Sequence, residues 1–129
     1  LGENLDQAVR LGLKPEGGFA ESPYAFTEAD LLRGKALYQS FCAICHGARG
    51  EGDGRAIPLG VPKPRSYHDP AVRDQPEGYF YFAATNGFGR MLPYKSRIPE
   101  RERWLIAHYI KRCLLSEACP EEVVHAEVH

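Results

Sequence analysis

The chain has 129 residues, of which 43% are hydrophobic and 26% charged, and its formal net charge is −1. That length fits a single domain with a buried core of its own. The balanced charge favours neither a nucleic acid nor a membrane surface as partner. No apolar run approaches the roughly 20 residues that a membrane-spanning helix needs.

Residues 1–26 read as an N-terminal extension. The apolar spacing over 1–13 predicts a short amphipathic helix, and the glycines and prolines of 14–26 predict a loop laid on the surface. Three aromatic residues are expected to pin this loop down by burying their rings: Phe19, Tyr24 and Phe26.

A longer helix is predicted to begin at Thr27, because Thr27 and Asp30 have the spacing of a capping box. The residues that follow, up to Phe41, place apolar side chains on one helical face. Gly34 lies inside this helix, where a glycine costs roughly 1 kcal/mol relative to alanine. We therefore expect another backbone to pass close to Gly34.

The helix leads into Cys42-Ala-Ile-Cys45-His46, a Cys-x-x-Cys-His motif of the kind that attaches haem c covalently. Two thiols three residues apart can each form a thioether with a vinyl group of one porphyrin. The adjacent His46 then offers its imidazole to the iron as the proximal ligand. Cys42, Cys45 and His46 are therefore the first candidate site residues, and the predicted cofactor is one covalent haem c.

Two other readings of the cysteines stay open from the sequence. A redox dithiol would place Cys42 and Cys45 after a strand, in a βαβ setting that this neighbourhood does not suggest. A zinc site would need four ligands, and Cys113 and Cys119 could complete the set. The histidine directly after Cys45 and the glycine-rich run beyond it favour haem.

Residues 47–70 contain five glycines and four prolines, which predicts an irregular loop that wraps a haem edge. A backbone carbonyl in this loop is expected to accept a hydrogen bond from His46 Nδ1, because such a bond fixes a ligating imidazole. Three prolines could aim that carbonyl: Pro58, Pro62 and Pro64.

Two further helices are predicted, over 75–85 and from Pro99 to about residue 112. Asn86-Gly87 is a strong stop signal for the first of them. The second buries Trp104 and its apolar neighbours. Residues 114–129 form a tail, and in an oxidising compartment Cys113 and Cys119 are expected to pair as a disulfide that ties the tail to the last helix.

Met91 lies in the loop over residues 87–98, next to Leu92-Pro93, and is the only thioether in the chain. We predict that it is the second axial ligand, because His/Met pairs are used in cytochromes c and favour the ferrous state. His46 and Met91 are thus the predicted metal ligands. Four rival histidines exist, of which the first is the strongest: His68, His108, His125 and His129.

The propionates of a haem need polar partners, and four loop residues could supply them: Arg65, Arg90, Tyr94 and Lys95. Trp104 is also included among the candidate haem-binding residues. Seven basic residues between Arg90 and Arg112 could form a basic rim that steers an acidic partner. A solvated helix face would explain these charges equally well.

These segments resemble the class I cytochrome c family. Residues 34–47 are similar to its first helix and haem motif, Met91–Tyr94 to its axial methionine loop, and residues 104–110 to its last helix. The resemblance covers about residues 27–115 and implies an all-α class I cytochrome c fold around one haem, with extensions over 1–26 and 116–129. It also implies that Gly34 and Tyr38 pack against the last helix.

A closer resemblance, carried by Lys63-Pro64-Arg65, Gly78-Tyr79 and the Met91–Tyr94 loop, is to the monohaem cytochrome c subunit of bacterial alternative complex III. It implies a one-electron carrier, not an enzyme, between a quinol-oxidising complex as donor and a terminal haem-copper oxygen reductase as acceptor. The alternative is a haem enzyme or gas sensor with an open sixth position on the iron.

The absence of an initiator methionine before Leu1 leads us to expect that a signal, anchor or leader was removed. Haem c is attached outside the bacterial cytoplasm. The expected location is therefore the periplasm or the outer face of the cytoplasmic membrane, with contact to the membrane only through a missing N-terminal anchor or a partner complex.

Overall fold

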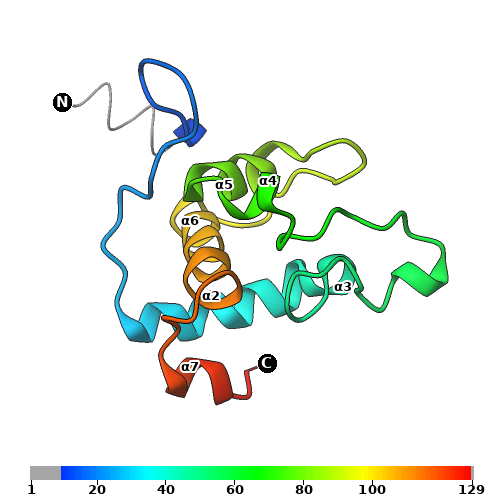
Figure 1. The fold of residues 1–129 in the computed structure, drawn as a ribbon. Coiled ribbons are helices and arrows are strands. Elements are labelled where there is room, and N and C mark those ends of the chain that lie inside the picture. The colour runs from blue at the N-terminus through cyan, green and yellow to red at the C-terminus, as the bar shows by residue number, and fades with distance from the viewer. Residues whose placement is uncertain (1–9, 129) are drawn as a thin grey trace.

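The computed structural model describes residues 10–128, and they form a helical fold (Figure 1). Outside the helices, strand-like pairing in this part of the chain is limited to two isolated bridges. The all-α prediction is therefore confirmed. The α-helices are α2 (Glu28–Phe41), α3 (Ala43–His46), α4 (Pro70–Arg73), α5 (Glu77–Asn86), α6 (Glu100–Tyr109) and α7 (Glu121–His125). A 3₁₀ turn, η1 (Ile57–Leu59), and a π turn, η2 (Ile110–Leu114), complete the set.

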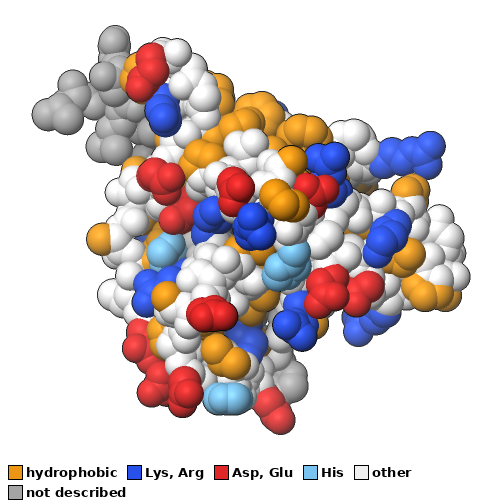
Figure 2. Space-filling view, viewed as in Figure 1, with side chains coloured by type: hydrophobic (Ala, Val, Ile, Leu, Met, Phe, Trp, Pro, Cys, Tyr) orange, Lys and Arg blue, Asp and Glu red, His pale blue; other side chains and the backbone are white. Residues whose placement is uncertain are grey.

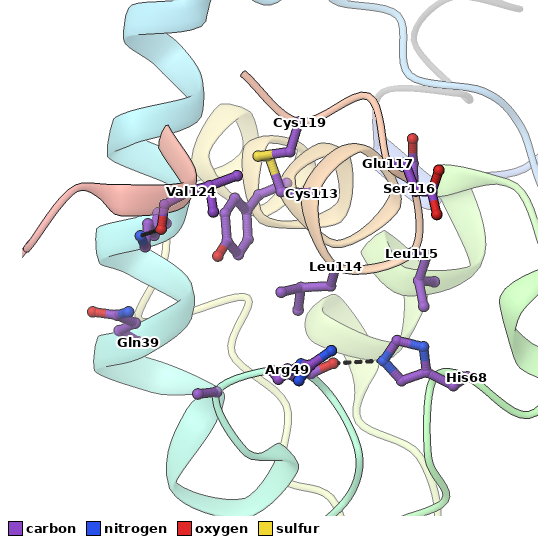
Figure 3. A pocket seen from close by; sticks show the side chains of 13 residues that line it. Gln39, Arg49, His68, Cys113, Leu114, Leu115, Ser116, Glu117, Cys119 and Val124 are labelled. Atoms are coloured by element: carbon purple, nitrogen blue, oxygen red, sulfur yellow. Dashed lines mark hydrogen bonds between the residues drawn. A yellow bond between two sulfur atoms is a disulfide. The ribbon is translucent and has the colours of Figure 1, made fainter. Parts of the chain in front are cut away.

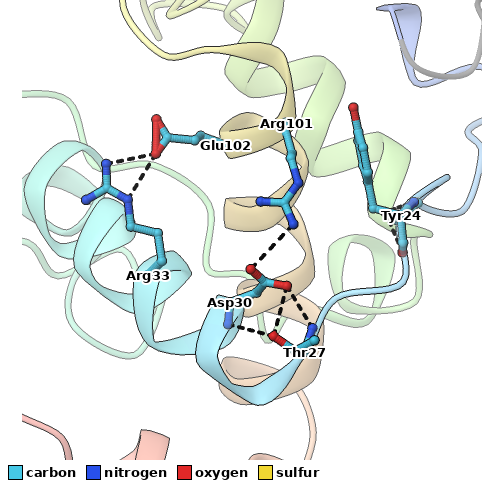
Figure 4. A network of polar contacts seen from close by, with 7 residues as sticks. Tyr24, Thr27, Asp30, Arg33, Arg101 and Glu102 are labelled. Atoms are coloured by element: carbon cyan, nitrogen blue, oxygen red, sulfur yellow. Dashed lines mark hydrogen bonds and ion pairs between the residues drawn. The ribbon is translucent and has the colours of Figure 1, made fainter.

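The predicted capping box opens α2. The amide of Asp30 donates to Thr27 Oγ1 at 3.2 Å, and the Thr27 amide donates to Asp30 Oδ2 at 2.9 Å. The same helix is tied to α6 by two ion pairs, Arg101 to Asp30 at 3.4 Å and Arg33 to Glu102 at 2.8 Å (Figure 4). A local signal thus fixes where α2 begins, and charged side chains on its first turns join it to α6.

The helices α2 and α6 cross at Gly34. A Cβ at this position would lie 3.1 Å from the Leu105 carbonyl oxygen and 3.1 Å from Tyr109 Cβ, so the close approach expected from the sequence is present. One turn further along, the ring of Tyr38 packs against that of Tyr109, with centroids 5.7 Å apart. The packing of Gly34 and Tyr38 of α2 on α6, which the family resemblance implies, is therefore confirmed.

Gly34→Val is expected to lower the free energy of unfolding by about 2 kcal/mol, because overpacking a tight contact forces helices apart. Urea unfolding followed by circular dichroism measures the effect. Ser40→Val, on the exposed face of the same helix, is the control and should stay within about 0.5 kcal/mol of wild type. Equal effects of both substitutions would contradict the packing argument.

Arg103 is a buried arginine that joins α6 to α5. Its guanidinium donates to Ile98 O at 2.6 Å, Thr85 Oγ1 at 3.0 Å and Tyr81 Oη at 3.1 Å. The Tyr81 ring in turn stacks on Trp104, with centroids 4.1 Å apart and planes 12° from parallel. Arg103 therefore holds the turn that precedes α6 against α5.

Arg103→Lys is expected to destabilise the fold by about 2 kcal/mol even though it keeps the charge. A lysine cannot reproduce the rigid fork of donors, so buried acceptors lose their partners. The midpoint of thermal unfolding reports the change. For Arg101→Lys, whose ion pair with Asp30 is half exposed, the expected effect is below about 1 kcal/mol.

The C-terminal tail is more ordered than the sequence predicted. A disulfide joins Cys113 to Cys119, and the following α7 packs on α2 with Val123 fully buried. The buried ammonium group of Lys35 donates to three backbone carbonyls at the end of α7: Val123 at 2.7 Å, Val124 at 2.9 Å and Ala126 at 2.8 Å. Since these carbonyls carry the negative end of a helix dipole, a cation from α2 anchors the tail.

The N-terminal segment lies against α5. Phe19 packs edge-on against Tyr79 at 5.4 Å, and Phe26 packs on His108 at 5.2 Å, so the predicted loop is pinned by its aromatic rings. Most of the helix predicted over 1–13 lies outside the described residues. Among residues 10–128, no helix is both long and apolar enough to cross a lipid bilayer.

Candidate functional site

A cavity of about 560 Å³ lies between the end of α2 with α3, the helix α5 and the loop after α5. In Figure 1, α3 lies below α5 and the loop that follows α5. The volume is within the roughly 300–1,000 Å³ typical of cofactor sites. The lining is mostly apolar and, among the described residues, contains no aspartate or glutamate.

The Cys-x-x-Cys-His motif forms one wall of this cavity. Cys42 follows the last turn of α2, and its amide donates to Tyr38 O at 2.8 Å. The single turn of α3 then carries Cys45 and His46, with the His46 amide donating to Cys42 O at 2.9 Å. Both thiols are free, and both thiols and the imidazole line the cavity.

Burial shifts the pKa of Cys42 and of His46. It raises the pKa of the Cys42 thiol to about 12 and lowers the pKa of the His46 imidazole to about 4. A redox-active dithiol needs a lowered thiol pKa, so the Cys42 environment disfavours the dithiol reading. A neutral imidazole is the form of histidine that binds a metal.

The carbonyl that was expected to hold His46 Nδ1 is not found, and that expectation is corrected. This nitrogen is buried and has no hydrogen-bond partner among the residues that the structure describes. The imidazole instead lies with its flat face on the ring of Tyr67, at a centroid distance of 4.8 Å. Of the three prolines named above, Pro62 and Pro64 line the cavity as apolar groups.

Met91 lines the same cavity from the loop after α5. A tight turn holds it, in which the Met91 amide donates to Phe88 O at 2.9 Å and the Phe88 amide donates to Met91 O at 3.3 Å. The amide of Tyr94 donates to Ala84 O at 2.8 Å and fixes the far end of the loop to α5. The structure thus brings together residues that lie 45 positions or more apart in the sequence.

These donors fit a covalently bound haem. One apolar cavity collects two free thiols, a partly buried imidazole that its lowered pKa keeps neutral, and the single thioether of the chain. Thiols are the groups that attach haem c, and an imidazole with a thioether is the axial pair of many cytochromes c. The apolar lining suits the porphyrin ring.

His68, the strongest rival ligand, faces a different cavity. Its Nε2 lies 2.8 Å from the carbonyl oxygen of Arg49, and both residues line a separate hollow of about 710 Å³ beside the Cys113–Cys119 disulfide (Figure 3). His108 pairs with Glu77 at 3.1 Å. The two remaining rivals are on α7 (His125) and outside the described residues (His129).

The zinc-site hypothesis required four cysteine ligands, and two of them, Cys113 and Cys119, instead form a disulfide. No cluster of three or more histidine, cysteine, aspartate or glutamate side chains that could hold a metal ion occurs within residues 10–128. The two motif cysteines are therefore not part of a four-ligand metal site in this structure.

The predicted propionate partners are split. Arg65, Arg90 and Tyr94 line the cavity, whereas Lys95 and Trp104 do not. Arg65 also pairs with Asp69 at 3.3 Å, and the Tyr94 hydroxyl donates to Phe41 O at 3.4 Å. The fully buried Trp104 stacks on Tyr81. The backbone carbonyl of Lys95 accepts a hydrogen bond from the Arg103 guanidinium at 3.1 Å.

The basic residues between Arg90 and Arg112 do not form one rim. Arg103 is buried, while Lys111 donates to Arg73 O at 2.7 Å and Arg112 to Ala118 O at 2.7 Å. Arg103 lies in α6 and Lys111 and Arg112 lie in η2, and their side chains contact different segments, so their nearness in sequence is not nearness in space.

Positive charge at the cavity comes instead from three residues in two loops. Lys63, Arg65 and Arg90 all belong to the lining. Figure 2 shows basic side chains at the edge of the molecule where Figure 1 places these loops. Lys63 and the aromatic Tyr67 were not predicted as site residues, because single residues in a loop rich in glycine and proline carry no periodic signal.

Comparisons with known proteins identify the family of the chain. Residues 29–110 match the sequence model of the family described as "Cytochrome C oxidase, cbb3-type, subunit III". A search of curated proteins finds no match.

Two solved structures share the fold. The "KustC0563 c-type cytochrome" is 21% identical, with a TM-score of 0.50 over 60% of this chain and 93% of its own. A chain of the "Kuenenia stuttgartiensis reducing HAO-like protein complex Kustc0457/Kustc0458" is 24% identical, with a TM-score of 0.60 over 86% of this chain and 55% of its own. Because the family match covers well over half of the chain and the neighbours share its helical fold, the chain belongs to the c-type cytochrome family described as cytochrome c oxidase, cbb3-type, subunit III.

Proposed function

We propose that the protein is a one-electron carrier that binds one haem c covalently. Cys42 and Cys45 would form the thioether links, with His46 and Met91 as the axial ligands. The single observation that carries this proposal is that these four residues, from segments far apart in sequence, line one apolar cavity. The sequence contains a single Cys-x-x-Cys-His motif, which supports one haem.

The bound haem would supply an iron centre that gains and loses one electron, and the protein sets the conditions for that exchange. The apolar lining keeps water away, and Met91 would hold the iron so that little rearranges when the charge of the iron changes. A thioether ligand favours the reduced state. Lys63, Arg65 and Arg90 place positive charge where the propionates or an acidic partner could meet it.

The surface beside the cavity suits brief contact with a redox partner. Phe88 and Leu92, in the methionine loop, are 55% and 71% exposed, and Val61 across the opening is 38% exposed. An apolar patch next to a few basic groups is typical of small, transient electron-transfer interfaces. Electron transfer through this face, without a substrate reaction, is the function that the site supports best.

The finer assignment is also a proposal. We infer a subunit of the alternative complex III type, which would receive electrons from a quinol-oxidising complex and pass them to a haem-copper oxygen reductase. Support comes from the resemblance of the Lys63-Pro64-Arg65 and Met91–Tyr94 segments. The proposed location is the periplasm or the outer face of the cytoplasmic membrane, and the Cys113–Cys119 disulfide is compatible with such an oxidising compartment.

The test is to produce the protein with a haem c maturation system and to measure its intact mass, spectrum and redox titration. We expect a covalent mass increase of one haem and a single one-electron transition. The ferric protein should show the long-wavelength band of a His/Met haem, and the ferrous protein should not bind carbon monoxide. Binding of carbon monoxide would favour the alternative, a haem enzyme or gas sensor. A colourless protein of unmodified mass would refute haem binding altogether.

A further inference from the structure

The imidazole of His46 is stacked on an aromatic ring. The ring centroids of His46 and Tyr67 lie 4.8 Å apart, and the ring planes are 19° from parallel. Tyr67 is buried, and both residues line the haem cavity. A flat neighbour at this distance limits rotation of the imidazole about its Cβ–Cγ bond, because turning the ring out of the stack would drive its edge into the tyrosine.

Tyr67 is itself held from several directions. Its amide donates to Gly50 O at 2.8 Å, and a Cβ on Gly50 would lie 2.5 Å from Tyr67 Cδ2, so the ring fits over a glycine. On another side the edge of the ring meets Phe80 at 5.4 Å, with the planes 87° apart. The ring of Tyr67 is therefore held in place, and the His46 imidazole is the ring that could otherwise rotate.

We propose that Tyr67 is a positioning residue that fixes the plane of the His46 imidazole through ring stacking. In many metal sites a hydrogen bond to the second ring nitrogen of a histidine performs this task. Here His46 Nδ1 has no such partner among the described residues, and the stack with Tyr67 is the contact that defines the ring plane. The inference rests on the proposed role of His46 as a haem ligand.

The stack needs an aromatic ring but not the phenol hydroxyl, which separates positioning from other roles. Tyr67→Phe keeps the aromatic ring, whereas Tyr67→Leu and Tyr67→Met fill the space with a side chain that has no ring. Tyr109→Leu is the matched control, because Tyr109 is a buried tyrosine that packs on Tyr38 and does not line the haem cavity. It should lower stability without disturbing the His46 ring.

The readouts are the electron paramagnetic resonance g-values and the haem-methyl proton shifts of the ferric protein, since both depend on the plane of the axial imidazole. We expect wild-type values for Tyr67→Phe and for Tyr109→Leu. Tyr67→Leu and Tyr67→Met should change the spread of the haem-methyl shifts and broaden the g-value distribution. Wild-type spectra from both non-aromatic variants would overturn the proposal.

A measurement on the unaltered protein keeps the test independent of how the variants fold. In the reduced, diamagnetic form, nuclear Overhauser contacts are expected between ring protons of His46 and Tyr67, and their absence would also overturn the proposal. Different results would contradict the proposed function and the role of Tyr67. If no covalent haem were found in the wild type, the proposed function would fall; if haem were attached but the contacts were missing, only the role of Tyr67 would fall.

Discussion

Replacing Cys42 and Cys45 together by serine is expected to abolish covalent haem attachment. Serine keeps the size and the local turn but cannot form a thioether, so acid-acetone extraction should remove any pigment that still binds. Either single substitution leaves one possible link and should give a partly attached product. Mass spectrometry of the denatured protein distinguishes the three cases.

The other two cysteines provide the matched control. Cys113→Ser with Cys119→Ser removes the disulfide but leaves the haem cavity untouched. Closing so short a loop is worth about 2 kcal/mol, so this variant should keep its haem and unfold at lower denaturant concentration. Loss of covalent haem from this control, with retention in the serine variant of Cys42 and Cys45, would reverse our assignment.

Replacing Met91 by alanine is expected to open the sixth coordination position. Removing the thioether takes away the ligand that favours the ferrous state, so the midpoint potential should fall by a sizeable part of the roughly 0.8 V range that axial ligands span. The long-wavelength ferric band should disappear, and the ferrous protein should bind carbon monoxide. Potentiometric titration and a carbon monoxide difference spectrum measure these changes.

Two neutral substitutions make the Met91 experiment specific. Leu92→Ala alters the neighbouring residue of the same loop, whose side chain is mostly exposed. His68→Ala removes the strongest rival ligand, which lies in the other cavity against the Arg49 carbonyl. Both should leave the spectrum and the potential close to wild type. A spectrum that changes with His68→Ala and not with Met91→Ala would show that Met91 is not the axial ligand.

Much of the fold follows from local sequence signals. The Thr27–Asp30 spacing predicts the start of α2, and glycine ends α5 at Gly87 as expected. Helix boundaries are shifted by a residue or two, since α5 begins at Glu77 and not at residue 75, and α6 begins at Glu100 and not at Pro99. Such signals involve residues within one or two helical turns of one another, so they can be recognised in the sequence without knowledge of the tertiary structure.

The candidate site is predictable for a related reason. Covalent haem attachment needs both thiols and the imidazole on one turn, so chemistry compresses Cys42, Cys45 and His46 into five consecutive residues. Met91 could be proposed because it is the only methionine. The alternatives for the ligand and for the cysteines could not be resolved at that level, because they concern which distant segments share a cavity.

The amino-acid sequence by itself therefore determined the helical class and the Cys-x-x-Cys-His motif and made Met91 the candidate axial ligand, because each of these inferences depends on residue type and short-range spacing. Only the tertiary structure decided that Arg103 is buried and leaves the surface, that Lys35 holds a C-terminal helix, and that Tyr67 lies under His46. The contacts of Arg103 with Thr85, of Tyr67 with His46 and of Lys35 with Val123 join residues 18, 21 and 88 positions apart. No local pattern encodes which chain segments pack together.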